Sequence, residues 1–147
     1  WGIVGQDGGR LSHIANGTIR IKSSLPFSER LEGIFSGLAA ILREYRPEAA
    51  SVEETFVNVN PQTTLKLGCA RGAAILAPAV AGIPVFEYSP ATIKQAVTGV
   101  GRAAKEQVAM MVGAILGRPG VDSEHAADAL AMAICHAHNR LALAPKK

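Results

Sequence analysis

The stretch "SEHAADALAMAICHAHNR", residues 123–140, contributes most to the fold prediction for this chain. Its many alanines are strong helix formers, and they predict one long helix with little side-chain bulk. His125 and Asp128 are three positions apart, so they share one face of that helix. Because alanines surround them, the helix can lie close against a sheet. The stretch therefore predicts a helix packed on a sheet, with an imidazole and a carboxylate on one face.

The segments upstream of this helix supply the strands of such a sheet. Two strands come first, joined by the turn residues of "GQDGG", and strands then alternate with helices. Strands are expected at 1–4, 11–22, within 49–56 and at 84–89; helices are expected up to about residue 45, at 61–82, at 90–97 and at 103–117. This order predicts one α/β domain over residues 1–147, with helices flanking a mixed sheet.

Length and composition restrict the class of protein. A chain of 147 residues with 48% hydrophobic residues can form the core of one domain. No apolar run approaches the roughly 20 residues that a membrane span needs, so no membrane partner is expected. The two cysteines, Cys69 and Cys135, fit neither a disulfide framework nor a paired-cysteine zinc pattern. A reducing, cytoplasmic location is the simpler interpretation.

Basic residues are unevenly distributed along the chain. The formal net charge is +3, but residues 57–118 hold six bases and only two acids. This imbalance allows a polyanion partner such as a nucleic acid. On charge alone, an ordinary solvated surface is the preferred explanation.

Glu53 follows the apolar start of an expected strand and comes just before a loop. In open α/β sheets ligands bind at the carboxyl ends of strands, and Glu54 must point to the opposite face from Glu53. If the alanine-rich helix lies on this sheet, Asp128 and His125 approach Glu53. Such a set predicts a Mg²⁺ or Mn²⁺ site able to hydrolyse a phosphodiester.

Ordinary structural roles are open for each of these residues. Asp128 near a helix start can serve the helix dipole, a lone histidine such as His125 is usually structural, and Glu53 can be a satisfied acid at a strand end. His136 and His138 in "CHAH" are two positions apart and diverge on a helix, so packing or surface roles are expected for them.

Several longer motifs carry a specific family resemblance. The chain contains "VEETF", "TTLKLGCARGAA", "VFEYSPATIKQAVTGVGRAAKEQV" and "HAADALAMAICH" in this order. Together they resemble RuvC-type Holliday junction resolvases of the RNase H-like superfamily, essentially from end to end. The resemblance implies a mixed five-stranded sheet flanked by helices. It also implies a homodimer that binds a four-way DNA junction and nicks two strands symmetrically, leaving 5′-phosphates, in DNA recombination and repair.

The resemblance also assigns roles to single residues. Glu53 and Asp128 match the family's catalytic, metal-binding acids, and His125 falls where members carry Asp or His. Mg²⁺ is the implied metal, and Mn²⁺ is expected to substitute. The residues expected to bind DNA are Phe56, by stacking, and Lys94, Lys105 and Arg71, by charge. The helix from Pro61 to about Gly82 resembles the family's dimerisation helix, and a branch-migration motor is an implied partner.

One departure from the family pattern concerns the first catalytic aspartate. The family carries it in a "GxDPG"-like motif on a strand just before the segment that starts here with Trp1. Asp7 does not match it, because Asp7 lies in the hairpin turn one strand later. We therefore expect a chain lacking the first strand of the sheet, either as a piece of a longer nuclease or as a protein with impaired cleavage.

This departure leaves rival functions open. A non-catalytic junction-binding module would keep Phe56 and the basic stretch without the chemistry. A nuclease for RNA–DNA hybrids or an actin-like phosphotransferase are rivals within the superfamily. The phosphotransferase needs glycine-rich phosphate loops on two hairpins, and the sequence offers no second copy.

Overall fold

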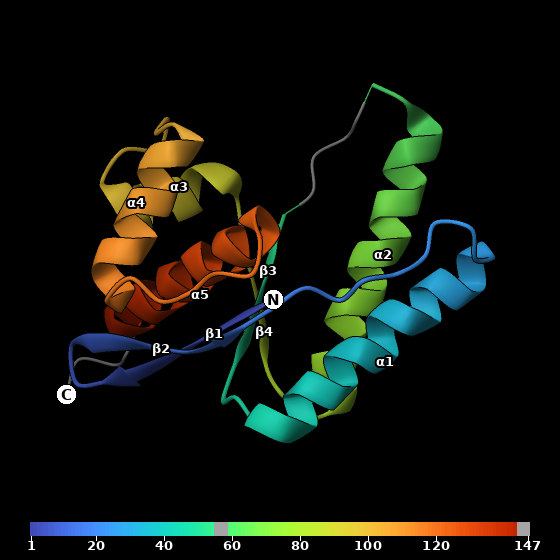
Figure 1. Ribbon diagram of the computed structural model, residues 1–147, viewed down its shortest axis with the longest axis horizontal. Coiled ribbons are helices and arrows are strands. Elements are labelled where there is room, and N and C mark those ends of the chain that lie inside the picture. Colours follow the sequence, from blue (N-terminus) through green and yellow to red (C-terminus); the bar gives the residue numbers. More distant parts are fainter. Residues whose placement is uncertain (55–58, 144–147) are drawn as a thin grey trace. The chain divides into compact units, whose positions relative to one another are not determined.

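The computed structural model describes residues 1–54 and 59–143, and for residues 141–143 it describes the backbone only. The chain folds into two compact units: the first unit, Trp1–Thr18 with Tyr88–Lys147, and the second unit, Ile19–Glu87. The elements are β1 (Gly2–Asp7), β2 (Arg10–Asn16), α1 (Phe27–Tyr45), β3 (Ala50–Glu53), α2 (Pro61–Val80), β4 (Val85–Tyr88), α3 (Pro90–Thr98), α4 (Lys105–Leu116) and α5 (Glu124–Leu143), labelled in Figure 1.

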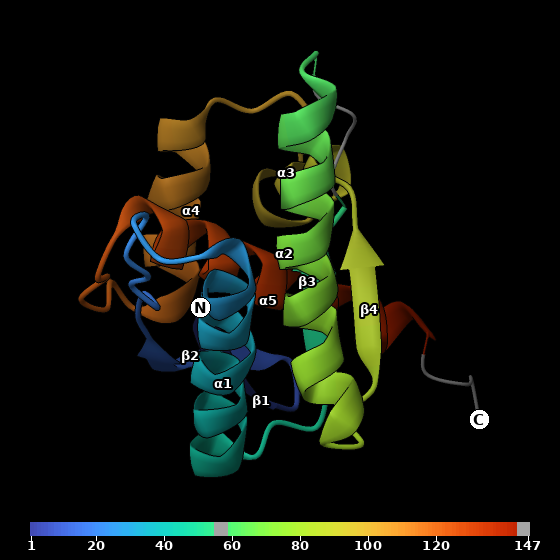
Figure 2. The same ribbon diagram turned by 90° about the vertical axis from the view of Figure 1, so that its right-hand side faces the viewer.

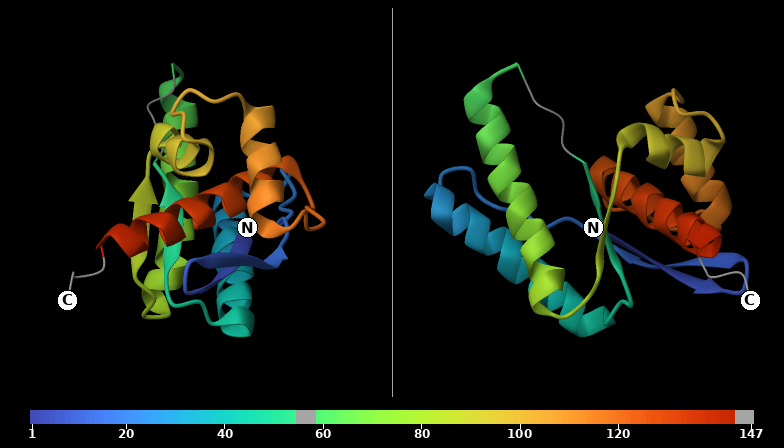
Figure 3. Two further views of the ribbon diagram at one scale, coloured as in Figure 1. Left: turned by 90° about the vertical axis from the view of Figure 1, so that its left-hand side faces the viewer. Right: turned by 180° about the vertical axis from the view of Figure 1, so that it is seen from behind.

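The first unit combines the β1–β2 hairpin with three helices. The strands pair antiparallel from Gly2 opposite Asn16 to Asp7 opposite Arg10. The register shifts between Ile3, which lies opposite Ala15, and Val4, which lies opposite His13. Gly8 has φ +58 in the turn, a conformation that glycine adopts without strain. Helices α3 and α4 gather around α5, beside this hairpin (Figure 3).

Helix α5 supplies the centre of the hydrophobic core in this unit. Leu130, Ile134 and Cys135 are fully buried, together with Val112 of α4. Strand β1 approaches α5 so closely that a Cβ added at Gly2 would lie 2.7 Å from Leu130 Cδ2 and 2.9 Å from the Leu130 backbone nitrogen. The close packing of an alanine-rich helix on a strand, expected from the sequence, is thus confirmed for β1.

The second unit pairs α1 with α2 (Figure 2), and α2 also contacts β3. The Asn60 side chain caps α2 by accepting hydrogen bonds from the backbone amides of Gln62 and Thr63. Helix α1 ends where Arg46 adopts a left-handed conformation, one residue before Pro47. Strands β3 and β4 hydrogen-bond to each other.

The sheet differs from the expectation. The prediction of one mixed sheet is not met in the described residues, which form two separate two-stranded sheets, β1–β2 and β3–β4. The second strand also ends at Asn16 rather than near Lys22. Ile19 and Ile21 instead pack on α1, where they lie next to Gly37 and Gly33. Contact with a helix therefore replaces strand pairing for residues that have strong β propensity. No helix in the described part of the chain is long and apolar enough to cross a membrane.

Candidate active site

The start of α5 is fixed by a serine cap. Ser123 Oγ accepts a hydrogen bond of 3.1 Å from the Ala126 amide, and Ser123 O accepts one of 3.0 Å from the Ala127 amide. The Ser123 hydroxyl also lies 2.8 Å from the hydroxyl of Thr18, in the segment after β2. These contacts satisfy amides that a helix start leaves unpaired, and they fix the first turn of α5. The acids of α5 consequently project from a well-anchored turn.

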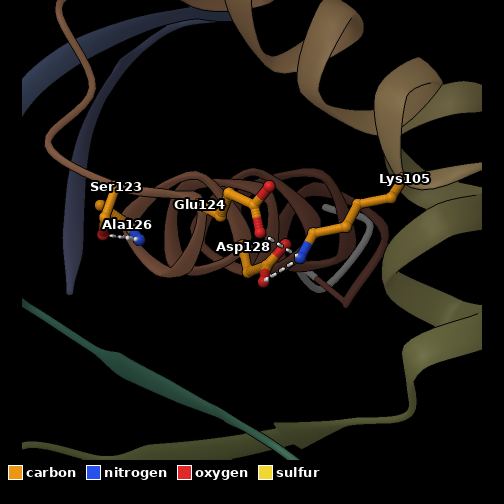
Figure 4. Close-up of polar contacts among 5 residues, drawn as sticks. All are labelled: Lys105, Ser123, Glu124, Ala126 and Asp128. Carbon is orange, nitrogen blue, oxygen red and sulfur yellow. Dashed lines mark hydrogen bonds and ion pairs between the residues drawn. The ribbon is translucent and has the colours of Figure 1, made fainter.

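Both acids of α5, Glu124 and Asp128, meet a lysine from α4 (Figure 4). Lys105 Nζ lies 3.1 Å from Glu124 Oε2 and 3.8 Å from Asp128 Oδ2. The hydrogen bond from Lys105 to Glu124, with a smaller contribution from the charge of Asp128, raises the pKa of Lys105. The ammonium form is thereby favoured, and a cation stands between the two carboxylates.

His125 and Asp128 are both exposed, while Ala126 and Leu130 on the same helix are fully buried. This pattern places the two polar residues on the side of α5 that faces away from the core. The structure therefore brings Lys105 and Asp128 together and leaves His125 on the exposed side of the same first turns. Their catalytic roles stay predictions.

Glu53 is the last residue of β3 and is exposed, at the strand end where the sequence places it. Its backbone carbonyl accepts a hydrogen bond of 3.0 Å from Arg71 Nε of α2. Arg71 also forms an ion pair of 2.9 Å with Glu87 of β4. Glu53 belongs to the second unit and Asp128 to the first, so their proximity stays a prediction.

The other residues expected to bind DNA have separate locations. Arg71 is engaged within the second unit by Glu87 and the Glu53 carbonyl, which gives it a structural role in addition to any contact with DNA. Lys94 is half-buried on α3, and Lys105 is exposed at the start of α4. Phe56 lies outside the described residues. DNA contacts of all four residues stay predictions.

The donor set at the start of α5 fits a hard divalent cation. Carboxylate oxygens are the ligands that Mg²⁺ and Mn²⁺ prefer, and Glu124 and Asp128 each direct one oxygen at the same ammonium group. Within residues 1–54 and 59–143, however, no three His, Cys, Asp or Glu side chains gather closely enough to hold a metal ion. Asp128 therefore fits as one member of a ligand set, while Glu124 is the nearer partner of Lys105.

The histidines near the end of α5 have different partners. His136 Nδ1 lies 2.8 Å from the Tyr88 hydroxyl, and His138 Nδ1 lies 3.1 Å from the Ala96 carbonyl. Burial lowers the pKa of His136, with the charge of Arg140 adding to the effect, and burial raises the pKa of Tyr88. The expected divergence of His136 and His138 is confirmed, and His136 has a packing role.

One side of α2 is apolar and exposed. Leu65, Leu76 and Val80 are 70%, 53% and 69% exposed. Gly68 and Gly72 lie on the same side, and a Cβ added at either would meet nothing within 4 Å. The opposite side holds the buried Ala77 and Pro78. These five exposed residues, called the α2 face below, form a continuous stripe with helical spacing.

Two features of the site were not anticipated from the sequence. Glu124 is four positions before Asp128, so the sequence shows that the two acids share one side of the helix. The sequence does not show that Lys105 of α4 is their common partner. The bridge from Arg71 to Glu53 and Glu87 joins residues 18 and 16 positions apart. Because local periodicity carries no information on such pairs, only the three-dimensional structure shows them.

Comparisons with known proteins agree with the motifs. The family described as crossover junction endodeoxyribonuclease RuvC matches residues 1–136. The RuvC of Rhodospirillum rubrum is 51% identical over 140 residues, which cover 95% of this chain and 83% of that protein. The RuvC of Citrifermentans bemidjiense is 52% identical over 139 residues, covering 95% and 85%.

A solved structure is similar along nearly the whole chain. The structure described as T. thermophilus RuvC in complex with Holliday junction substrate has a TM-score of 0.88 and 38% identity. The match covers 95% of this chain and 86% of that one. With a family match over residues 1–136 and relatives about half identical, this chain belongs to the RuvC family of crossover junction endodeoxyribonucleases, which are hydrolases.

Proposed function

We propose that this chain resolves Holliday junctions in DNA recombination and repair by metal-dependent hydrolysis of phosphodiester bonds. The observation that carries the proposal is the 51% identity to a crossover junction endodeoxyribonuclease over 95% of the chain. A structural relative that was solved with a Holliday junction supports the substrate. The carboxylates of Glu53 and Asp128, both exposed, supply acids of the type that the chemistry needs.

In the proposed mechanism Glu53 and Asp128 would each supply carboxylate oxygens to a divalent cation, Mg²⁺ or Mn²⁺. The bound cation would polarise the scissile phosphate and lower the pKa of a water molecule. His125, on the same side of α5 as Asp128, would complete the ligand set or accept a proton from the attacking water.

Two lysines are proposed to stabilise the negative charge that develops on the phosphate. The attacking water oxygen forms a bond to phosphorus, and the bond from phosphorus to the 3′ oxygen breaks. The leaving oxygen takes up a proton, so the products are a 3′-hydroxyl and a 5′-phosphate. Negative charge grows on the phosphate oxygens during this step, and the ammonium groups of Lys94 and Lys105 would stabilise it. Phe56 and Arg71 are proposed to contact the junction.

A homodimer is proposed to present two such sites to one junction. Support comes from the α2 face, where three large apolar side chains are more than half exposed. Gly68 and Gly72 leave space between them for a second helix to approach closely. Two copies joined along this face would bury apolar surface that is exposed in one copy.

The remaining expectations are proposed on the resemblance. In fold, the two two-stranded sheets would be parts of an RNase H-like sheet of five strands. A branch-migration motor would be a partner of the junction-bound dimer. A reducing, cytoplasmic location agrees with two cysteines that are both free, Cys69 exposed and Cys135 buried.

The proposed function is tested by incubating the protein with a mobile four-way junction and with linear duplex of the same sequence, in Mg²⁺ and in Mn²⁺. Because the match covers 83% of the Rhodospirillum rubrum relative, a second protein that is extended at its N-terminus to the length of that relative is tested beside this chain. Metal-dependent, symmetric nicking of the junction alone, by either protein, supports the proposal. Junction binding without cleavage by both proteins contradicts it and favours a junction-binding module.

A further inference from the structure

The ion pair between α4 and α5 places a cation beside an acid that the proposed function assigns to metal binding. Lys105 Nζ is 3.8 Å from Asp128 Oδ2 and hydrogen-bonds at 3.1 Å to Glu124 Oε2. The three side chains are 55%, 52% and 81% exposed, in the order Lys105, Asp128, Glu124. A single ammonium group thus forms ion pairs with both carboxylates at the surface of the first unit (Figure 4).

We propose that Lys105 is the built-in counter-cation of Asp128, which a divalent metal ion must displace, and that Glu124 retains the ammonium group after the exchange. The inference rests on the proposed function, because it takes Asp128 to be a metal ligand. It goes further in giving Lys105 a role before DNA binds, and in giving Glu124 a role as a positioning residue.

Electrostatics requires such an exchange. A divalent cation and an ammonium group at the same carboxylate repel each other, so close contact of both with Asp128 is unfavourable. The ion pair is open to solvent on all three side chains, and exposed ion pairs contribute little to stability. Displacement of Lys105 from Asp128 therefore costs little free energy.

The geometry favours Glu124 as the residue that keeps the lysine. Glu124 is the nearer of the two acids. It accepts a hydrogen bond from Lys105, whereas Asp128 forms only the longer ion pair with Lys105. The backbone near Lys105 is anchored by Ala103 and Val108, which are 4% and 8% exposed. The exchange then needs only rotation of a flexible lysine side chain. The displaced ammonium group then stays hydrogen-bonded to Glu124.

The test measures the binding of Mn²⁺ to the whole chain without DNA. Binding is monitored through the electron paramagnetic resonance signal of free Mn²⁺. Lys105→Met removes the competing cation and keeps an unbranched side chain. Arg102→Met is the matched control, since Arg102 is exposed in the turn before α4 and the same positive charge is lost. Urea unfolding confirms that each variant is folded.

We expect Lys105→Met to bind Mn²⁺ about two- to fivefold more tightly than the unaltered chain, the range that one exposed ion pair allows. Arg102→Met should change the affinity less, and in an Asp128→Asn background the Lys105→Met substitution should no longer change it. Equal affinity of the Lys105→Met and Arg102→Met variants would overturn the inference. So would an absence of Mn²⁺ binding in every variant, because there would be no metal for Lys105 to oppose.

The role of Glu124 is tested by a double-mutant cycle. Glu124→Gln removes a negative charge near the metal in any background, which weakens Mn²⁺ binding somewhat. With Lys105 present it also leaves Asp128 as the only acid for the ammonium group, so the weakening should be greater than in the Lys105→Met background. Additive effects of the two substitutions would overturn the anchoring role.

These outcomes are distinct from the outcome for the proposed function. Junction cleavage is measured in a separate assay with DNA, whereas Mn²⁺ binding is measured on protein alone. A protein that cuts junctions but shows no effect of Lys105 on Mn²⁺ affinity overturns only the exchange. A protein that binds Mn²⁺ more tightly after Lys105→Met but never cuts junctions overturns only the nuclease function.

Discussion

The guanidinium group of Arg71 on α2 lies 2.9 Å from the carboxylate of Glu87 on β4. The same side chain donates a hydrogen bond of 3.0 Å to the Glu53 carbonyl at the end of β3. One arginine thus connects a helix with both strands of the second unit. The proposed metal ligand Glu53 depends on this connection for the position of its backbone.

Loss of the Arg71–Glu87 ion pair should destabilise the second unit. Glu87→Gln keeps the size of the side chain and removes its charge, so the free energy of unfolding should fall by about 0.5–1 kcal/mol. Urea unfolding measures the change. Glu32→Gln, an exposed acid on α1, is the control. Equal midpoints for the two variants would show that the ion pair contributes nothing.

Gly2 should be intolerant of a side chain. Its added Cβ would meet Leu130 at 2.7–2.9 Å, including the backbone nitrogen, which has little freedom to move within α5. We expect Gly2→Ala to lower the free energy of unfolding by about 1–3 kcal/mol through overpacking. Gly9→Ala is the matched control, because a Cβ at Gly9 meets nothing within 4 Å. A Gly2→Ala variant as stable as Gly9→Ala would contradict the close approach of β1 to α5.

His136 should make the fold sensitive to acid. Burial lowers its pKa in the folded protein below the ordinary value of 6.5, so the unfolded chain binds the proton more readily. Its contribution is fully present above about pH 6.5 and is lost as the pH falls from there towards the lower folded pKa.

The measurement is the free energy of unfolding in urea between pH 8 and pH 5. His136→Gln should lose less stability over the acidic half of this range than the unaltered chain. His138→Gln, an exposed histidine on the same helix, should follow the unaltered chain. Parallel curves for all three proteins would exclude His136 as a source of acid sensitivity.

The α2 face should hold the dimer together. Leu76 is 53% exposed, and Leu76→Glu would place a charge in an apolar interface, which is costly. We expect this variant to sediment as a monomer where the unaltered chain is a dimer. Met110→Glu is the control, because Met110 is 65% exposed on α4. A Leu76→Glu variant that stays dimeric would place the interface elsewhere.

Local patterns in the sequence predicted the helices well. The cap at Asn60 with Pro61, and the alanine-rich spacing of α5, are determined by neighbouring residues. The joining of the strands was predicted less well, because pairing depends on distant partners. Ile19 and Ile21 have strong β propensity, yet glycines on α1 offer them a closer contact.

The candidate site shows the same division. Glu53 at a strand end and Asp128 on the exposed side of a helix follow from alternation and helical spacing. The lysine that meets Glu124 and Asp128 comes from another helix, 19 positions away from Glu124. Lys105 was expected to contact DNA through the family resemblance. Its contact with two acids of the same chain could not be predicted, because no local sequence pattern indicates it.

The central claim is that Glu53 is a catalytic acid. Its neighbour Glu54 offers a matched comparison, since Glu53 ends β3, Glu54 follows it directly, and both are exposed. The most direct measurement is the single-turnover rate of junction cleavage in Mg²⁺ by the Glu53→Gln and Glu54→Gln variants. The substitutions are made in this chain or in the N-terminally extended protein, depending on which of them cleaves the junction. We expect Glu53→Gln to lose at least about a hundredfold in rate with unchanged junction binding, and Glu54→Gln to stay near the unaltered rate. Equal rates for the two variants would contradict the proposed site.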